Sequence, residues 1–138
     1  MRSLLSLLFG IILLSAGPCC AGTIYVKPDG TGDAPTIEAA LDSAAAGDTL
    51  LLASGTFTGA GNHGVTIPNK NLTIVSETGN ADDCVIDCEG DFGFWFEGGT
   101  AVIEGITMIN ATSAGALQVW PGWAVLRVRD CVFSDCLG

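Results

Sequence analysis

Short apolar pairs recur along the chain at steps that lie between 22 and 29 in the numbering. In each pair the two apolar residues stand two positions apart, as they do when a β-strand turns alternate side chains to one face. One series has steps of 22, 29 and 25: Leu50/Leu52, Leu72/Ile74, Ala101/Ile103 and Leu126/Val128. A second series has steps of 29 and 23: Val65/Ile67, Phe94/Phe96 and Leu117/Val119. The two series interleave, so each period holds at least two short strands.

Two related stretches, AVIEGITMIN (101–110) and AVLRVRDCVF (124–133), break the strand pattern at the same place. Their inward candidates include a step of three residues: Ile103, Ile106 and Met108 in the first stretch, and Val128, Cys131 and Phe133 in the second. Such a step reverses the strand alternation, so we expect a corner at Gly105 and at Asp130. The stretches can be aligned by their Ala-Val, at a step of 23, or by this corner, at a step of 25. Either setting keeps the same face inward, and the corner favours the second.

One segment, Pro35–Ala46, has helical rather than strand periodicity. Its apolar residues follow the spacing i, i+3, i+4, i+7 that gives a helix one apolar face: Ile37, Ala40, Leu41 and Ala44. Pro35 suits a first helical turn and Gly47 suits a helix end. A short strand, Thr23–Val26, is predicted before the helix.

Periods of this length, with several short strands and 19 glycines, indicate a solenoid. The leucine-rich pattern LxxLxLxxN is absent. We therefore predict an all-β fold, a right-handed parallel β-helix of about three coils over residues 49–138. Residues 22–48 would supply a strand and an amphipathic helix that covers the open core and strand edges of the first coil.

Residues 1–21 predict export. A basic residue precedes the apolar run Leu4–Leu14, and small residues follow, which indicates a signal peptide cleaved after Ala21. The run is too short for a membrane span. A lipid anchor on Cys19 or Cys20 is the alternative, although Pro18 stands where a lipobox has Gly or Ala. We expect a secreted or cell-surface protein without a transmembrane segment after cleavage.

The charge of the chain limits the classes of molecule that it is expected to bind. Cleavage removes Arg2 and leaves 15 acidic residues against 4 basic ones, a net charge of −11. Such a chain does not hold nucleic acid by its phosphates. In an exported protein an acidic excess supports solubility, and more rarely it indicates Ca²⁺ binding.

From Thr23 onward the motifs follow the order TIYVKPDGTGDAPTIEAAL, VTIPNKNLTIVSETGN, FWFEGGTAVIEGITMINA and VRDCVFSDC. This order resembles the N-terminal part of the pectate-lyase-like right-handed parallel β-helix superfamily. It is similar also to bacterial secreted right-handed β-helix repeat proteins and to the repeats of polymorphic outer-membrane proteins. The resemblance implies the fold and leaves the activity open, because the superfamily includes lyases, hydrolases, esterases, adhesins and surface proteins.

The stretch Asp29–Leu41 is similar to the start of pectin methylesterases, which act through two carboxylates, an arginine and glutamines. The nearest equivalent of their glutamine motif is GALQVW (115–120), and on its Ala-Leu-x-Val core the family's leading glutamine falls on Ser113. The first catalytic aspartate of the family would fall at or after Gly138. The resemblance therefore assigns no catalytic residue here.

Three tryptophans are the candidates for glycan contact. Trp95 lies between Phe94 and Phe96, so it faces outward if those two are core, and Trp120 and Trp123 flank a Pro-Gly turn. Exposed aromatic rings in a secreted protein can stack on sugars, whereas packing under a loop is the alternative.

Charged residues offer two weaker candidate sites. Five acidic residues cluster within ten positions and could bind Ca²⁺ or lie in solvated turns, and we favour the turns and predict no metal site: Asp82, Asp83, Asp87, Glu89 and Asp91. Glu104, Arg127 and Arg129 are expected to point outward from their strands. They would form either a site for a sugar carboxylate or an exposed face with ion pairs.

The cysteines and the histidine favour structural roles. Cys131 occupies an inward position and Cys84 is expected to do the same, which predicts buried free thiols. A disulfide between Cys88 and Cys136, both taken to lie near turns, is the alternative that geometry must decide. His63 lies in the loop GAGNHG without a nucleophile nearby in sequence, which indicates a loop histidine.

Two hypotheses for the function follow. The first is a non-catalytic secreted or cell-surface β-helix module, structural, adhesive or glycan-binding, that forms the N-terminal part of a longer protein. Its partners would be polysaccharide or cell-envelope glycan, and a complete small domain could self-associate end to end through its uncapped last coil. The alternative is the N-terminal part of a polysaccharide-active enzyme, pectinesterase- or pectate-lyase-like, with its catalytic residues beyond Gly138.

Overall fold

A computed structural model describes residues 20–112 and 114–137. The predicted signal peptide, except for Cys20 and Ala21, lies outside these residues, as does Ser113. In the described part of the chain, no helix is long and apolar enough to cross a membrane.

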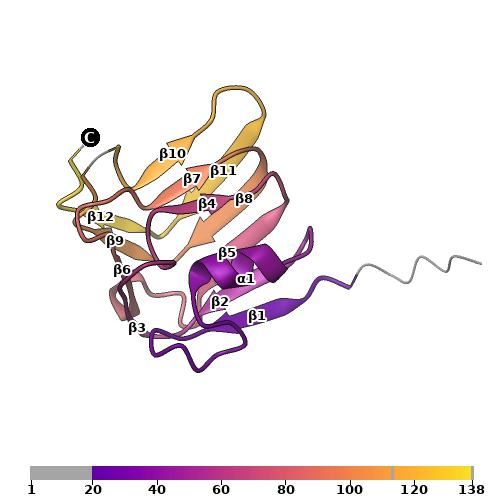
Figure 1. The fold of residues 1–138 in the computed structure, drawn as a ribbon, viewed down its shortest axis with the longest axis horizontal. Coiled ribbons are helices and arrows are strands. Elements are labelled where there is room, and N and C mark those ends of the chain that lie inside the picture. The colour runs from indigo at the N-terminus through magenta and orange to yellow at the C-terminus, as the bar shows by residue number, and fades with distance from the viewer. Residues whose placement is uncertain (1–19, 113, 138) are drawn as a thin grey trace, which may run out of the picture.

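The strands form three parallel sheets that wind around one core (Figure 1). The first sheet has the order β1 (Thr23–Val26), β2 (Thr49–Leu52), β5 (Leu72–Ser76), β8 (Gly99–Glu104), β11 (Ala124–Arg129). The second has the order β10 (Leu117–Val119), β7 (Phe94–Phe96), β4 (Val65–Ile67). The third has the order β12 (Val132–Ser134), β9 (Thr107–Ile109), β6 (Cys84–Asp87), β3 (Gly55–Phe57).

This arrangement is a right-handed parallel β-helix of about four turns, which confirms the predicted fold class. The count exceeds the predicted three coils because β11 and β12 add a turn to the three that contain β4, β7 and β10. The predicted short strand is present as β1, which pairs with β2 and extends the first sheet at its N-terminal edge.

Inward side chains from successive turns stack to form the core. Leu50, Ile74 and Ile103 occupy one column, and all three are at most 1% exposed. In the second sheet the predicted steps are confirmed, because Phe94 pairs with Val65 on one side and with Leu117 on the other.

One predicted register is wrong. β2 pairs with β5 so that Leu50 lies beside Ile74, not beside Leu72, and Leu52 lies beside Ser76. A shift of two positions keeps the same face inward, so the apolar pattern alone does not separate the two registers. Ser76 is buried beside Leu52, but because it is polar, the apolar pattern of the sequence does not identify it as an inward residue.

The predicted corner is confirmed. Gly105 and Asp130 both have a positive φ, of 66° and 48°, and β8 pairs with β11 in the expected register, with Val128 beside Ile103. At Gly105 a side chain has no room, because a Cβ there would lie 2.7 Å from Ser76 Oγ and 2.8 Å from Gly79 O. Glycine is therefore required at this position by both its backbone conformation and its packing.

The helix α1 (Ile37–Ser43) is shorter than predicted. It begins after Thr36, whose Oγ1 accepts a hydrogen bond from Ala39 N at 3.2 Å, so Pro35 precedes the N-cap instead of lying in the first turn. It ends at Ala44, which has extended backbone angles. Gly47, with a φ of 96°, turns the chain toward β2 and does not end the helix.

The predicted apolar face of α1 covers the core at the first turn. All four of its predicted residues are buried: Ile37, Ala40, Leu41 and Ala44. The helix contacts β1, β2 and β4, beside the sheets at the N-terminal end of the solenoid (Figure 1). It therefore covers this end of the core as a further turn would.

Inward positions of the last described turn are only partly covered. Val128 is 40% exposed and Phe133 is 43% exposed, and Cys131 is half-buried. These side chains lie on the inward face, as predicted. They stay partly exposed because, among the described residues, they have a neighbouring turn on one side only.

The cysteines are free thiols in the described part of the chain. Cys84 is buried as predicted, and burial raises the pKa of its thiol to about 12. Cys88 is also buried, not near the surface of a turn, and burial raises its pKa to about 11.

The alternative disulfide between Cys88 and Cys136 is not compatible with this fold. Cys88 follows β6 and Cys136 follows β12, with β9 between them, so their backbones are about 9.5 Å apart at the usual strand spacing. A disulfide needs Cα atoms closer than about 7 Å, so these two residues do not pair.

The stacked core generates the first prediction. Replacing Ile74 with Ala should lower the free energy of unfolding by about 2–5 kcal/mol, because the side chain is fully buried between Leu50 and Ile103. Thr73→Ala, at the neighbouring outward position of β5, is the control and should cost less than about 1 kcal/mol. Denaturant unfolding followed by circular dichroism measures both values, and equal losses would contradict the inward assignment of Ile74.

Candidate functional site

The outer face of the second sheet carries a row of outward side chains centred on Trp95, which is itself half-buried. This residue lies in β7 between buried Phe94 and Phe96, and its side chain faces outward as predicted. In register beside it lie Thr66 on β4 and Gln118 on β10. The row thus draws one outward residue from each of three successive turns.

Trp120 adds a second large ring to this face. Its backbone N–H donates to Phe96 O at 2.9 Å, which holds the end of β10 against β7. The ring centroid lies 5.9 Å from that of Trp95 at an interplanar angle of 41°. Phe92 makes an edge-to-face contact with Trp95, with ring centroids 6.5 Å apart and an interplanar angle of 72°. Trp95 therefore contacts two further aromatic rings.

These rings line an open groove of about 500 Å³, together with Thr66 and Glu97. We call this feature the aromatic groove: Thr66, Phe92, Trp95, Glu97 and Trp120. Its volume lies within the range usual for ligand sites, and its lining is mainly aromatic with two polar groups at hand, as such sites commonly are. Trp120 is 58% exposed, so part of the aromatic surface is open to solvent.

Trp123 does not belong to the aromatic groove. It lies beyond the Pro-Gly turn that follows Trp120, and it is 91% exposed. The three tryptophans proposed as glycan contacts therefore separate into a pair that shares one groove and a single exposed ring. Phe92 was not predicted, since its aromatic contact depends on a turn that the strand pattern does not specify.

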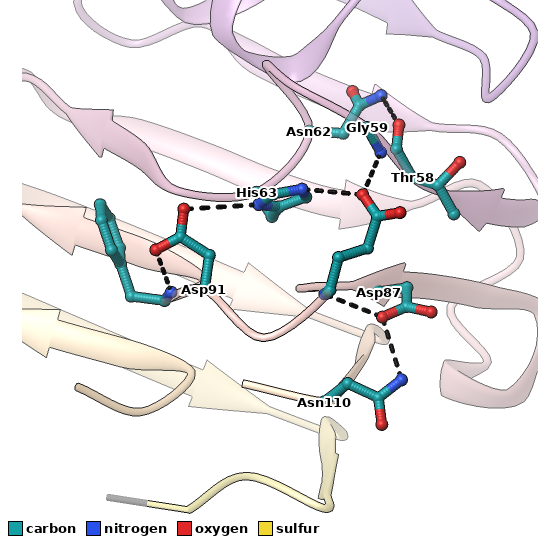
Figure 2. Close-up of polar contacts among 9 residues, drawn as sticks. Thr58, Gly59, Asn62, His63, Asp87, Asp91 and Asn110 are labelled. Carbon is teal, nitrogen blue, oxygen red and sulfur yellow. Dashed lines mark hydrogen bonds and ion pairs between the residues drawn. The ribbon is translucent and has the colours of Figure 1, made fainter. Parts of the chain in front are cut away.

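A polar network surrounds His63 (Figure 2). His63 Nε2 lies 2.9 Å from Glu89 Oε2, and His63 Nδ1 lies 3.8 Å from Asp91 Oδ2. The opposite oxygen of Asp91 accepts the backbone N–H of Phe92 at 2.8 Å. The imidazole is only 14% exposed, and its Nδ1 has no hydrogen-bond partner among the described residues. The next residue of the loop, Gly64, donates its backbone N–H to Phe92 O at 2.8 Å and so ties the loop to Phe92. His63 is a loop residue as predicted, and its carboxylate partners come from the next turn of the solenoid.

The same loop anchors the helix α1. Asn62 Oδ1 accepts the backbone N–H of Ile37 at 3.1 Å, and Asn62 Nδ2 donates to Thr58 O at 2.8 Å; Figure 2 shows the second of these bonds. Asn62 is a buried polar residue that the sequence pattern does not identify. Its two bonds satisfy a free N–H at the start of the helix and fix the loop backbone.

The five acidic residues do not converge. Asp82 and Asp83 lie on the 3-10 turn η1 (Ala81–Asp83), and the other three lie on or after the end of β6. Asp87 Oδ1 accepts from Asn110 Nδ2 at 3.0 Å and from Glu89 N at 2.9 Å. Within the residues the structure describes, no three His, Cys, Asp or Glu side chains gather as metal ligands would.

The predicted charged face lies elsewhere. Glu104 on β8 and the two arginines Arg127 and Arg129 on β11 belong to the first sheet, not to the sheet that bears the aromatic groove. Arg129 stands beside Glu104 in register, yet among the described residues the contacts within salt-bridge distance are those of His63 with Glu89 and Asp91, which are ionic only when the imidazole is protonated. The ion pairs expected on this face are therefore not formed among the described residues.

Comparison of the chain with protein-family models, with curated proteins and with solved structures gives no match.

The Asp87 contacts generate a pH-dependent prediction. Hydrogen bonds from Asn110 and from Glu89 N lower the pKa of Asp87 below its ordinary value of 3.8. A carboxyl group with a lowered pKa in the folded state adds stability above its ordinary pKa, and this stability is lost as the pH falls through the folded-state pKa. Asp87→Asn should therefore reduce the loss of stability between about pH 5 and pH 2.

Thermal melts across this pH range measure the effect. Glu104→Gln is the matched control, because it removes a carboxylate that makes no side-chain hydrogen bond within the described chain, and it should keep the acid dependence of the wild type. An unchanged acid dependence in Asp87→Asn would contradict the assigned contacts.

Proposed function

We propose that the protein is a non-catalytic secreted or cell-surface β-helix module that binds glycan through the aromatic groove. The observation that supports this most is the pairing of Trp95 and Trp120, from successive turns, in one open groove. Sugar rings have apolar faces and polar edges, so they stack on aromatic side chains while their hydroxyls stay hydrated or meet nearby polar groups. Here Thr66 and Glu97 belong to the lining and offer a hydroxyl and a carboxylate to such a sugar.

The lining of the aromatic groove favours binding over catalysis. Hydrolysis of a glycosidic bond ordinarily uses two carboxyl groups in one site. Among the five lining residues only Glu97 carries one. The groove therefore has a surface on which a sugar can rest and lacks, among these residues, the acid–base pair that the reaction needs.

Membership of the pectate-lyase-like superfamily and export are parts of the same proposal. The right-handed parallel β-helix, the N-terminal helix against its first turn and the order of motifs from Thr23 to Leu41 support that placement. The apolar run Leu4–Leu14 supports export. Exposed tryptophans suit a protein that meets polysaccharide outside the cell or on its surface.

Removal of either groove tryptophan tests the proposal. We expect Trp95→Ala and Trp120→Ala to weaken binding of soluble β-linked oligosaccharides about tenfold, since loss of one aromatic contact costs about 1–1.5 kcal/mol. Trp123→Ala is the matched control and should change the affinity less than about twofold, since that ring lies outside the groove. Isothermal titration calorimetry provides the dissociation constants. Equal losses in all three variants, or no binding by the wild-type protein, would refute the proposal.

A further inference from the structure

The aromatic groove combines ring faces with a negative charge and contains no positive one. Three of its five residues are aromatic, and Glu97 is the single ionisable group among them. The face of an aromatic ring attracts a cation through its quadrupole, most strongly for tryptophan. A carboxylate beside such rings also attracts a cation, through the Coulomb interaction between opposite charges.

The basic residues of the described chain all lie outside the aromatic groove. Lys27 Nζ lies over the Tyr25 ring, 5.5 Å from its centroid, and Lys70 Nζ donates to Ala44 O at 2.8 Å, near the end of α1. The two arginines lie on β11 in the first sheet. A ligand in the groove therefore meets no ammonium or guanidinium group among the lining residues.

The surroundings of the aromatic groove are also acidic. The carboxylates of Glu89 and Asp91, which precede Phe92 closely in the sequence, flank His63, and the whole chain has a formal net charge of −10. A uronic acid polymer would bring further negative charge to this surface, and its carboxylates would be repelled. A cationic ligand would be attracted both at the groove and over a longer range.

We propose that the aromatic groove selects glycans of amino sugars, with a protonated amine of the sugar held between the Trp95 and Trp120 rings and the Glu97 carboxylate. This inference rests on the proposed glycan-binding function and specifies its ligand class as glycans with free, protonated amino groups. Stacking supplies affinity for the sugar ring, and the ammonium group supplies selectivity over neutral and acidic glycans.

Calorimetric titration with three β-1,4-linked oligomers of equal length tests this inference. The oligomers are of glucosamine, of N-acetylglucosamine and of glucose, at about pH 5.5 and low salt, where carboxylates are ionised and amines protonated. We expect the glucosamine oligomer to bind about fivefold to tenfold more tightly than the other two, and this preference to shrink at high salt.

Two variants with the same change in net charge separate a specific contact from general attraction. Glu97→Gln should weaken binding of the glucosamine oligomer about threefold to fivefold and leave the glucose oligomer within about twofold. Glu104→Gln, on the first sheet, should leave both unchanged. Within the described chain neither carboxylate makes a side-chain hydrogen bond, and the melting temperature of each variant verifies that it is folded.

The outcomes distinguish the two proposals. If the glucose oligomer binds as tightly as the glucosamine oligomer, or if Glu104→Gln weakens binding as much as Glu97→Gln, the selectivity for amino sugars is refuted while glycan binding stands. If none of the oligomers binds, both proposals fail.

Discussion

The parallel pairing of equivalent strands in successive turns is the constraint on which the rest of this structure depends. Each strand of three to six residues is too short to be stable alone, and it gains its backbone hydrogen bonds and buried neighbours from the turns beside it. Inward residues must therefore stack in columns such as Leu50, Ile74 and Ile103. Outward residues are free of this requirement. The aromatic groove lies on that unconstrained outer face, so its residues can serve a ligand without disturbing the core.

The difference between local spacing within a strand and the varying loop lengths of a turn also explains which features the sequence predicts well. The strands that carry the two series of apolar pairs, the inward face of α1 and the corner at Gly105 and Asp130 all depend on local spacing, and each was predicted correctly, whereas β3 was not predicted. The length of chain in a turn varies, however, because the loops between strands differ in length. The register of β2 against β5 depends on such a loop, and a buried serine concealed it.

The site was predicted only in part for the same reason. That Trp95 faces outward follows from strand parity, but its contacts with Trp120 and Phe92 depend on how two separate turns lie against each other. The contact of His63 with Glu89 joins residues 26 positions apart, and no local pattern relates them. Polar networks between loops of successive turns need the full three-dimensional register, which periodicity alone does not supply.

The loop between β3 and β4 connects the N-terminal helix to the aromatic groove. Asn62 Oδ1 accepts the backbone N–H of Ile37, the first residue of α1, and the backbone N–H of Gly64 donates to Phe92 O at 2.8 Å. A single loop is thus hydrogen-bonded both to the helix and to a residue of the aromatic groove. By thermodynamic linkage, any molecule that favours the ordered groove also disfavours local opening of the helix. Binding of a ligand in the aromatic groove would then make local opening of α1, at the N-terminal end of the solenoid, less frequent.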